Sequence, residues 1–162
     1  MKIMKQLFKA VIAILAVALI ASSCATHKGT SSNSVSRGKF VGTWTLTTVT
    51  YDGLLPGSVQ AVFNQGPPQD FAGSTWKLTN SGNGTYTLGG GTTQTIFWSV
   101  YNGDASGTMF QFKKLYEGDK AQNVADGYRL VVASNDGASM VLKSAVAIGD
   151  KTGYVVFSFT KN

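Results

Sequence analysis

Apolar and polar residues alternate with a period of two from Lys39 to Asn162, and this pattern indicates β-strands. The period of 3.6 residues that indicates amphipathic helices is almost absent. The first run, FVGTWTLTTVTY, is rich in the β-branched and aromatic residues that favour strands. Eight strands are predicted, with the ranges Phe40–Tyr51, Ser74–Thr79, Gly84–Leu88, Thr93–Tyr101, Thr108–Tyr116, Tyr128–Ser134, Ser139–Ser144 and Gly153–Thr160.

Most of the predicted strands follow each other closely, with turn-forming residues between them. Examples are Gly89-Gly90-Gly91 and Asn135-Asp136-Gly137. Short links join neighbouring strands into an antiparallel meander. Eight such strands favour a closed up-and-down barrel, because closure removes the exposed sheet edges. A sandwich of two sheets is the main alternative.

Two links are longer than the others. Ser58–Asn64 (SVQAVFN) is predicted to form about two helical turns, stopped by Gly66-Pro67-Pro68, and is well placed to cover one open end of a barrel. Glu117–Asp126 is polar and long enough for one short helical turn.

The N-terminus has the pattern of a secretory signal. Lysines at positions 2, 5 and 9 precede the apolar run Ala10–Ala21, which is too short to span a bilayer. Ala21-Ser22-Ser23-Cys24 then resembles a lipobox, the signal that directs lipid attachment to a bacterial cysteine. We therefore predict a signal peptide at 1–23, a flexible tether at 24–38 with a lipidated Cys24, and a barrel domain at 39–162.

Cys24 is the single cysteine of the chain. The alternative is an ordinary signal peptide cut near Ala21 or Ser23, which would leave an exported free thiol. Several acyl chains would anchor the protein stably to a membrane. Position 25 is alanine, whereas many lipoproteins retained on the inner membrane have an aspartate there. The expected localisation is therefore the periplasmic side of the outer membrane. Display on the cell surface stays open as the alternative.

Charge and composition argue against nucleic acid as a partner. The formal charge of +6 includes three lysines of the predicted signal, so the remaining chain has 11 basic and 8 acidic residues, or +3. The basic residues are scattered along the sequence, whereas nucleic-acid-binding domains usually gather them on one face. The one histidine, His27, lies in the tether.

Residues for common catalytic and metal centres are absent from the predicted domain, which has no histidine and no cysteine. Most of its acidic residues lie beside glycine-marked turns, where aspartate favours the turn itself. Glu117, Asp119 and Asp126 do not have the spacing of a calcium loop. We therefore expect a protein that is not an enzyme and that has no metal or cofactor.

Several short motifs resemble the lipocalin-like lipoproteins of Bacteroidetes. Gly42-Thr43-Trp44 resembles the G-x-W signature at the start of the lipocalin barrel. The similarity continues through Gly73–Trp76, Gly84–Thr87, Ile96–Ser99 and Gly127–Leu130. The resemblance implies an eight-stranded barrel with Gly42 and Trp44 at its closed end, and it implies a small apolar ligand inside.

The more apolar face of each strand is expected to point inward. This face comprises Phe40, Trp44, Leu46, Trp76, Leu78, Tyr86, Leu88, Ile96, Trp98, Phe110, Phe112, Tyr128, Leu130, Val132, Met140, Leu142, Val155, Phe157 and Phe159. An eight-stranded barrel is just wide enough to be filled by side chains or to hold one small ligand. The outward aromatic residues, candidates for a protein contact, are Tyr51, Phe97, Tyr101 and Tyr154.

Two functions remain open on the sequence. In the first, which we favour here, the barrel binds a small apolar ligand lined by Trp76, Trp98, Phe110 and Tyr128. In the second, the barrel is filled, and the protein is an envelope interaction module that contacts another protein or a glycan. The sequence does not indicate the oligomeric state.

Lipidation of Cys24 can be tested by metabolic labelling with palmitate. We expect the chain to incorporate the label and the Cys24→Ala variant to lose it, because the cysteine thiol is the acceptor. A Ser23→Ala variant serves as the control and should remain labelled. Label retained in Cys24→Ala would contradict the assignment.

Overall fold

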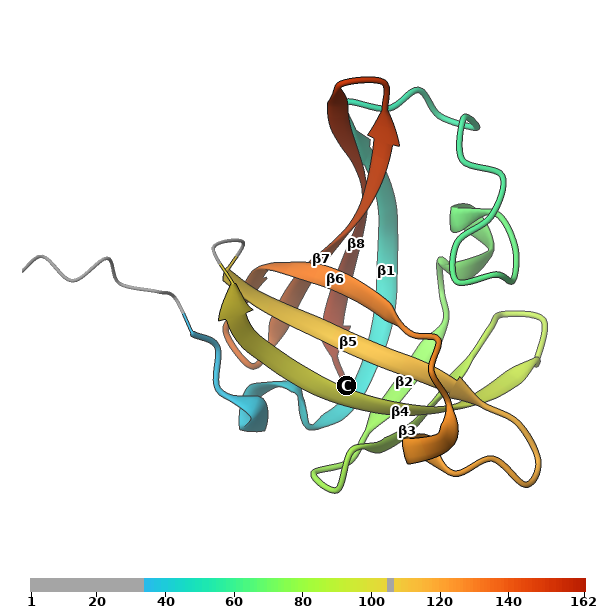
Figure 1. Ribbon diagram of the computed structural model, residues 1–162, viewed down its shortest axis with the longest axis vertical. Coiled ribbons are helices and arrows are strands. Elements are labelled where there is room, and N and C mark those ends of the chain that lie inside the picture. Colours follow the sequence, from blue (N-terminus) through green and yellow to red (C-terminus); the bar gives the residue numbers. More distant parts are fainter. Residues whose placement is uncertain (1–33, 105–106) are drawn as a thin grey trace, which may run out of the picture. The chain divides into compact units, whose positions relative to one another are not determined.

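The computed structural model describes residues 34–104 and 107–162 as a closed barrel of eight antiparallel strands (Figure 1). The predicted signal peptide, Cys24 and most of the predicted tether lie outside the described residues. Among the residues that are described, no helix is long and apolar enough to cross a membrane. The strands are β1 (Gly42–Asp52), β2 (Thr75–Leu78), β3 (Asn83–Thr87), β4 (Thr93–Asp104), β5 (Gly107–Leu115), β6 (Tyr128–Asn135), β7 (Ser139–Ile148) and β8 (Lys151–Lys161).

Each strand pairs with the next one in the sequence, and β1 also pairs with β8. The predicted up-and-down barrel is therefore confirmed, and the two-sheet alternative is excluded. β7 and β8 are longer than predicted and stay paired to Ile148 and Lys151 at the hairpin turn. This hairpin rises at the top of Figure 1, with the end of β1 beside it.

The inner face of the barrel is the one that the sequence predicted. Nearly all of the residues expected to point inward are buried, and Leu88, Tyr128 and Val132 are partly buried against the same core. This agreement follows from the strict period of two, because side chains alternate between the faces of a strand.

A β-bulge in β1 breaks that alternation. Leu46 pairs with Phe159 and Thr48 with Ser158, so Thr47 is the extra residue. One extra residue moves all following side chains to the opposite face. Val49 is therefore buried, and Tyr51 packs against the core. The prediction that Tyr51 points outward is wrong for this reason.

The link after β1 also differs from its predicted form. Ser58–Asn64 contains no helix; Val62 and Gly66 instead form a short antiparallel bridge. Phe63 and Asn64 turn the chain with positive φ angles of 55° and 48°. Seven residues are too few for a stable isolated helix, and the turn lets the Phe63 ring enter the core. A 3-10 helix follows at Pro68–Phe71, where the proline starts a helix rather than stopping one.

Phe63 covers one end of the barrel, as the position of this link predicted. Its ring lies 5.1–6.4 Å, centroid to centroid, from five core rings on separate elements. These are Phe71, Trp76, Phe112, Tyr128 and Phe157. The covering group is thus one aromatic side chain, and it is almost fully buried.

The opposite end is closed where the chain enters β1. A 3-10 helix at Arg37–Phe40 places the Phe40 ring inside the barrel. Trp44 Nε1 donates a hydrogen bond to the Phe40 carbonyl at 2.8 Å, and the Lys161 ammonium lies 5.2 Å from the Trp44 ring. Gly42 has a φ of 141°, and a Cβ there would collide with the Lys161 side chain.

Trp44 is 0% exposed, so its replacement by alanine should remove a large part of this closure. We expect Trp44→Ala to lower the free energy of unfolding by about 3–5 kcal/mol, measured by urea denaturation. Leu55, which is 78% exposed, provides the control. Leu55→Ala should change stability by less than about 0.5 kcal/mol. Equal effects of the two substitutions would contradict the assigned closure.

Candidate functional site

The four residues predicted to line a ligand cavity lie on the inner side of the barrel in two groups. Trp98 on β4 and Phe110 on β5 stack with ring centroids 5.8 Å apart, near Phe40. Trp76 on β2 and Tyr128 on β6 both contact Phe63 at the other end. The structure therefore brings Trp98 and Phe110 into direct contact, whereas Trp76 and Tyr128 are connected through the Phe63 ring.

Phe112 connects the two groups. Its ring centroid lies 6.1 Å from Phe110, 5.5 Å from Trp76 and 5.1 Å from Tyr128. A continuous set of ring contacts thus runs through the barrel from Phe40 to Phe63. Each predicted cavity residue already contacts aromatic rings of the same chain.

Polar atoms inside the barrel also have partners from the chain itself. Trp76 Nε1 donates to Ser74 Oγ at 3.0 Å, and Trp98 Nε1 donates to the Asn83 carbonyl at 3.2 Å. The Tyr86 hydroxyl donates to Gln65 Oε1, and burial raises the pKa of Tyr86 far above its ordinary value. No buried side-chain nitrogen or oxygen lacks a hydrogen bond in the part of the chain that the structure describes. These interior groups are therefore engaged in holding the fold.

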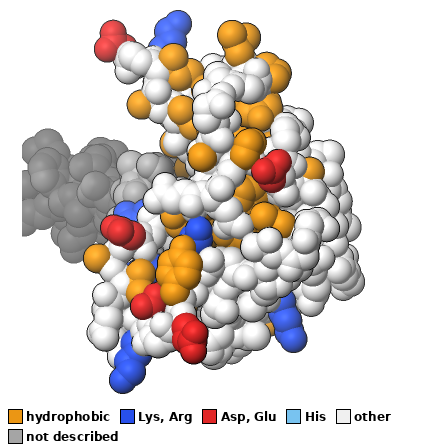
Figure 2. Space-filling view, turned by 90° about the vertical axis from the view of Figure 1, so that its right-hand side faces the viewer, with side chains coloured by type: hydrophobic (Ala, Val, Ile, Leu, Met, Phe, Trp, Pro, Cys, Tyr) orange, Lys and Arg blue, Asp and Glu red, His pale blue; other side chains and the backbone are white. Residues whose placement is uncertain are grey.

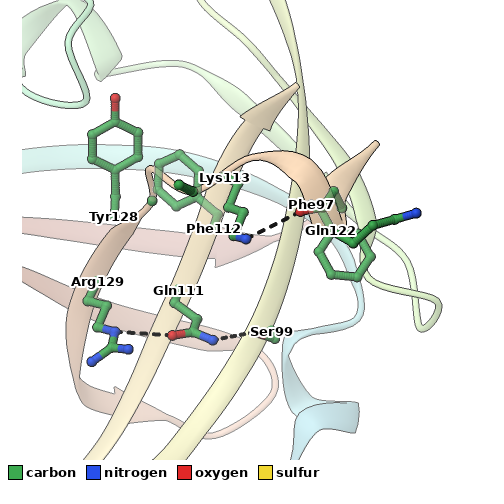
Figure 3. A pocket seen from close by; sticks show the side chains of 11 residues that line it. Phe97, Ser99, Gln111, Phe112, Lys113, Gln122, Tyr128 and Arg129 are labelled. Carbon is green, nitrogen blue, oxygen red and sulfur yellow. Dashed lines mark hydrogen bonds between the residues drawn. The ribbon is translucent and has the colours of Figure 1, made fainter. Parts of the chain in front are cut away.

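A hollow of about 700 Å³ lies on the outer wall of β4, β5 and β6, beside the link that joins β5 to β6. Figure 3 shows its side chains. We call it the β4–β6 hollow. The strands contribute Phe97, Ser99, Gln111, Lys113 and Arg129, and the link contributes Ala121, Gln122, Ala125 and Gly127; the inward-facing Phe112 and Tyr128 border it.

Strand register places the outward side chains of this wall in rows. Ser99 pairs with Gln111, and Gln111 pairs with Arg129, so three polar residues lie directly across three strands. Gln111 joins them, because its Nε2 donates to Ser99 Oγ at 2.7 Å and its Oε1 accepts from Arg129 Nε at 3.2 Å. Figure 3 shows this row. Phe97 and Lys113 pair in the next row.

Lys113 holds the β5–β6 link against the wall. Its Nζ donates to the carbonyls of Val124 at 2.5 Å and Ala121 at 3.3 Å. Lys114, the next residue, points to the other side and donates to the Phe63 carbonyl at 3.2 Å. The two lysines therefore lie on opposite faces of β5, and each fixes a different link.

The charge of the hollow is one-sided. Lys113 and Arg129 are its charged residues, and neither Asp nor Glu is among the residues that line it. The Arg129 guanidinium lies 4.9 Å from the Tyr101 ring centroid. Burial raises the pKa of Tyr128, with smaller contributions from Tyr116 and Asp126, so this phenol is neutral at physiological pH. The hollow therefore offers positive charge, amides and aromatic surface.

Sequence reasoning found only part of this wall. It singled out Phe97 and Tyr101 as outward aromatic residues, and both are partly exposed beside the polar row. It missed Ser99, Gln111 and Arg129. The sequence does show that Ser99 lies on the same face of its strand as Phe97 and Tyr101. It does not show that Ser99, Gln111 and Arg129 are neighbours, because that depends on the register of three strands.

Other predicted surface residues lie elsewhere. Tyr154 on β8 contacts Lys143, whose Nζ lies 5.3 Å from the ring centroid and 2.9 Å from Asp52 Oδ2. Asp119 Oδ2 accepts a hydrogen bond from the Tyr116 amide at 2.8 Å, as expected of a turn former. Across residues 34–104 and 107–162, no three His, Cys, Asp or Glu side chains gather as a metal site would require.

Figure 2 shows acidic and basic side chains scattered over one face of the barrel rather than gathered in a charged patch.

Comparison with known proteins adds no relative: no protein-family model, curated protein or solved structure matches this chain.

The role of Lys113 in holding the link can be tested by hydrogen exchange. We expect Lys113→Met to speed amide exchange across residues 120–127 and to lower stability by about 1 kcal/mol, because two carbonyls lose their donor. Lys114→Met is the matched control on the opposite face and should leave exchange in this segment unchanged. Identical exchange in both variants would show that Lys113 does not hold the link.

Proposed function

We propose that this chain is a lipid-anchored envelope protein that acts as a non-enzymatic interaction module. Its barrel is a filled scaffold, and its outer wall and links bind the partner, another envelope protein or a glycan. The main support is the position of Phe63, whose ring contacts five core rings and occupies the end through which an internal ligand would enter.

Packing favours this function over the binding of an apolar ligand inside the barrel. A ligand site needs a few hundred cubic ångströms. To open that much space, several rings among Trp76, Trp98, Phe110 and Phe112 would have to leave the core. Burial of each such side chain is worth about 1.5–3 kcal/mol. Displacing several would use much of the stability of a domain of this size.

The proposed lipid anchor and the proposed localisation derive from the sequence. Cys24 after an apolar segment supports lipidation, and Ala25 supports the periplasmic side of the outer membrane. The resemblance to lipocalin-like lipoproteins is consistent with an eight-stranded barrel that follows a short tether. A filled interior distinguishes the function proposed here from the binding of a small apolar ligand inside the barrel, which the lipocalin resemblance implies.

Binding of cis-parinarate, a fluorescent fatty acid, tests whether the barrel has an internal site. In non-ionic detergent we expect no saturable binding inside the barrel of the purified full chain, because the interior is occupied by its own rings. Binding inside the barrel is identified as binding that Trp98→Leu weakens and Arg129→Gln leaves unchanged. Native mass spectrometry should likewise show no apolar molecule bound in one-to-one ratio apart from the covalent anchor.

The Phe63→Ala variant provides a positive control, since removal of a buried ring can leave a dry cavity that admits apolar molecules. If circular dichroism shows that it folds, it should gain probe fluorescence. The result against our proposal is one cis-parinarate bound per wild-type chain and weakened by Trp98→Leu. That result would favour an internal apolar ligand.

A further inference from the structure

We propose that the β4–β6 hollow binds a small ligand that carries a carboxylate on a ring, either an aromatic acid or an acidic sugar. Arg129 pairs with the carboxylate, and Phe97 contacts one face of the ring. This inference rests on the proposed function, in which the outer wall is the binding surface. It goes beyond that function by adding a small-ligand site on the wall, with the chemical class of the ligand and the residues that select it.

The first argument is the charge around the hollow. Lys113 and Arg129 line it without an acidic residue among the lining set. Among the described residues, Lys143 and Asp52 form an ion pair, but neither of them lines the hollow. Lys113 is engaged by two link carbonyls, so Arg129 is the cation available to a ligand. An anionic group on a ligand would pair with the positive charge of Arg129.

The second argument is that the Arg129 guanidinium is held in place before a ligand arrives. Its Nε donates to Gln111 Oε1 at 3.2 Å, and its Cζ lies 4.9 Å from the Tyr101 ring centroid. These contacts leave the two terminal nitrogens as donors. A guanidinium binds a carboxylate with two parallel hydrogen bonds, and fixing it beforehand reduces the entropy lost on binding.

The third argument is the space and chemistry beside Arg129. Ser99 accepts the Gln111 amide hydrogen bond at 2.7 Å, so its own hydroxyl hydrogen can be donated to a ligand. Phe97 is partly exposed and offers a flat apolar surface in the neighbouring row. Ala121, Ala125 and Gly127 have small or no side chains and leave the hollow open. A ring with one anionic substituent matches these three properties.

Isothermal titration of the full chain in non-ionic detergent, with a detergent-only blank, tests the inference. Four probes distinguish the contribution of the carboxylate from that of the ring. They are 2-naphthoate, its neutral analogue 2-naphthamide, glucuronate and its neutral counterpart glucose. We expect saturable one-to-one binding of at least one carboxylate and at least tenfold weaker binding of its neutral counterpart. Binding of 2-naphthoate alone identifies the aromatic-acid source, and binding of glucuronate alone identifies the acidic-sugar source.

Three variants test the site. Arg129→Gln removes the guanidinium and should weaken carboxylate binding about tenfold or more. Lys77→Gln removes one positive charge from an exposed position on β2, away from the hollow, and should leave affinity within twofold. Ala125→Trp keeps every charge but fills the hollow, and it should abolish binding.

The inference is overturned if neither carboxylate binds saturably, if neutral probes bind equally well, or if Lys77→Gln weakens binding as much as Arg129→Gln. Such a failure leaves the filled-scaffold function standing when cis-parinarate also fails to bind. Saturable cis-parinarate binding inside the wild-type barrel refutes that function whatever the carboxylates do. The two experiments therefore separate the two proposals.

Discussion

The width of an eight-stranded barrel is the constraint on which the rest of this structure depends. At this strand number the interior is just large enough to be filled by side chains. Here the filling is aromatic and continuous, from Phe40 through Phe110 and Phe112 to Phe63. Pairing of β1 with β8 completes the ring and leaves no open sheet edge in the described domain. Both ends are then closed by the chain itself, with Phe63 at one end and Trp44 beneath Lys161 at the other.

Because aromatic rings occupy the interior, we propose that the outer wall carries the function. There, strand register gathers Ser99, Gln111 and Arg129 into one hydrogen-bonded row. The neighbouring lysine, Lys113, holds the β5–β6 link beside this row through two carbonyls. The wall is part of the hydrogen-bonded sheet of the barrel, and the link lies beside it. In the proposed site, residues held in this way lose little conformational entropy when a ligand binds.

Much of the fold could be predicted from the sequence. The eight strands and their inward faces follow from a period of two and from glycine-rich turns, and both features are local. The two failures have non-local causes. The bulge at Thr47 is invisible in the pattern because the extra residue and the one after it, Thr48, are both threonines, and it turns Val49 and Tyr51 inward. The link at Ser58–Asn64 has helix-compatible residues, but burial of Phe63 among five rings outweighs that weak preference.

The sequence by itself determined the class of fold, the lack of histidine in the domain and the position of the one cysteine at Cys24. Composition and local alternation are sufficient for these statements. The tertiary structure decided whether the aromatic residues fill the barrel and which outward residues meet. Arg129 and Ser99 are 30 positions apart and share one hydrogen-bonded row only because β5 lies between β4 and β6 in a particular register. Register arises from packing of the whole barrel, so a site built across three strands cannot be read along one.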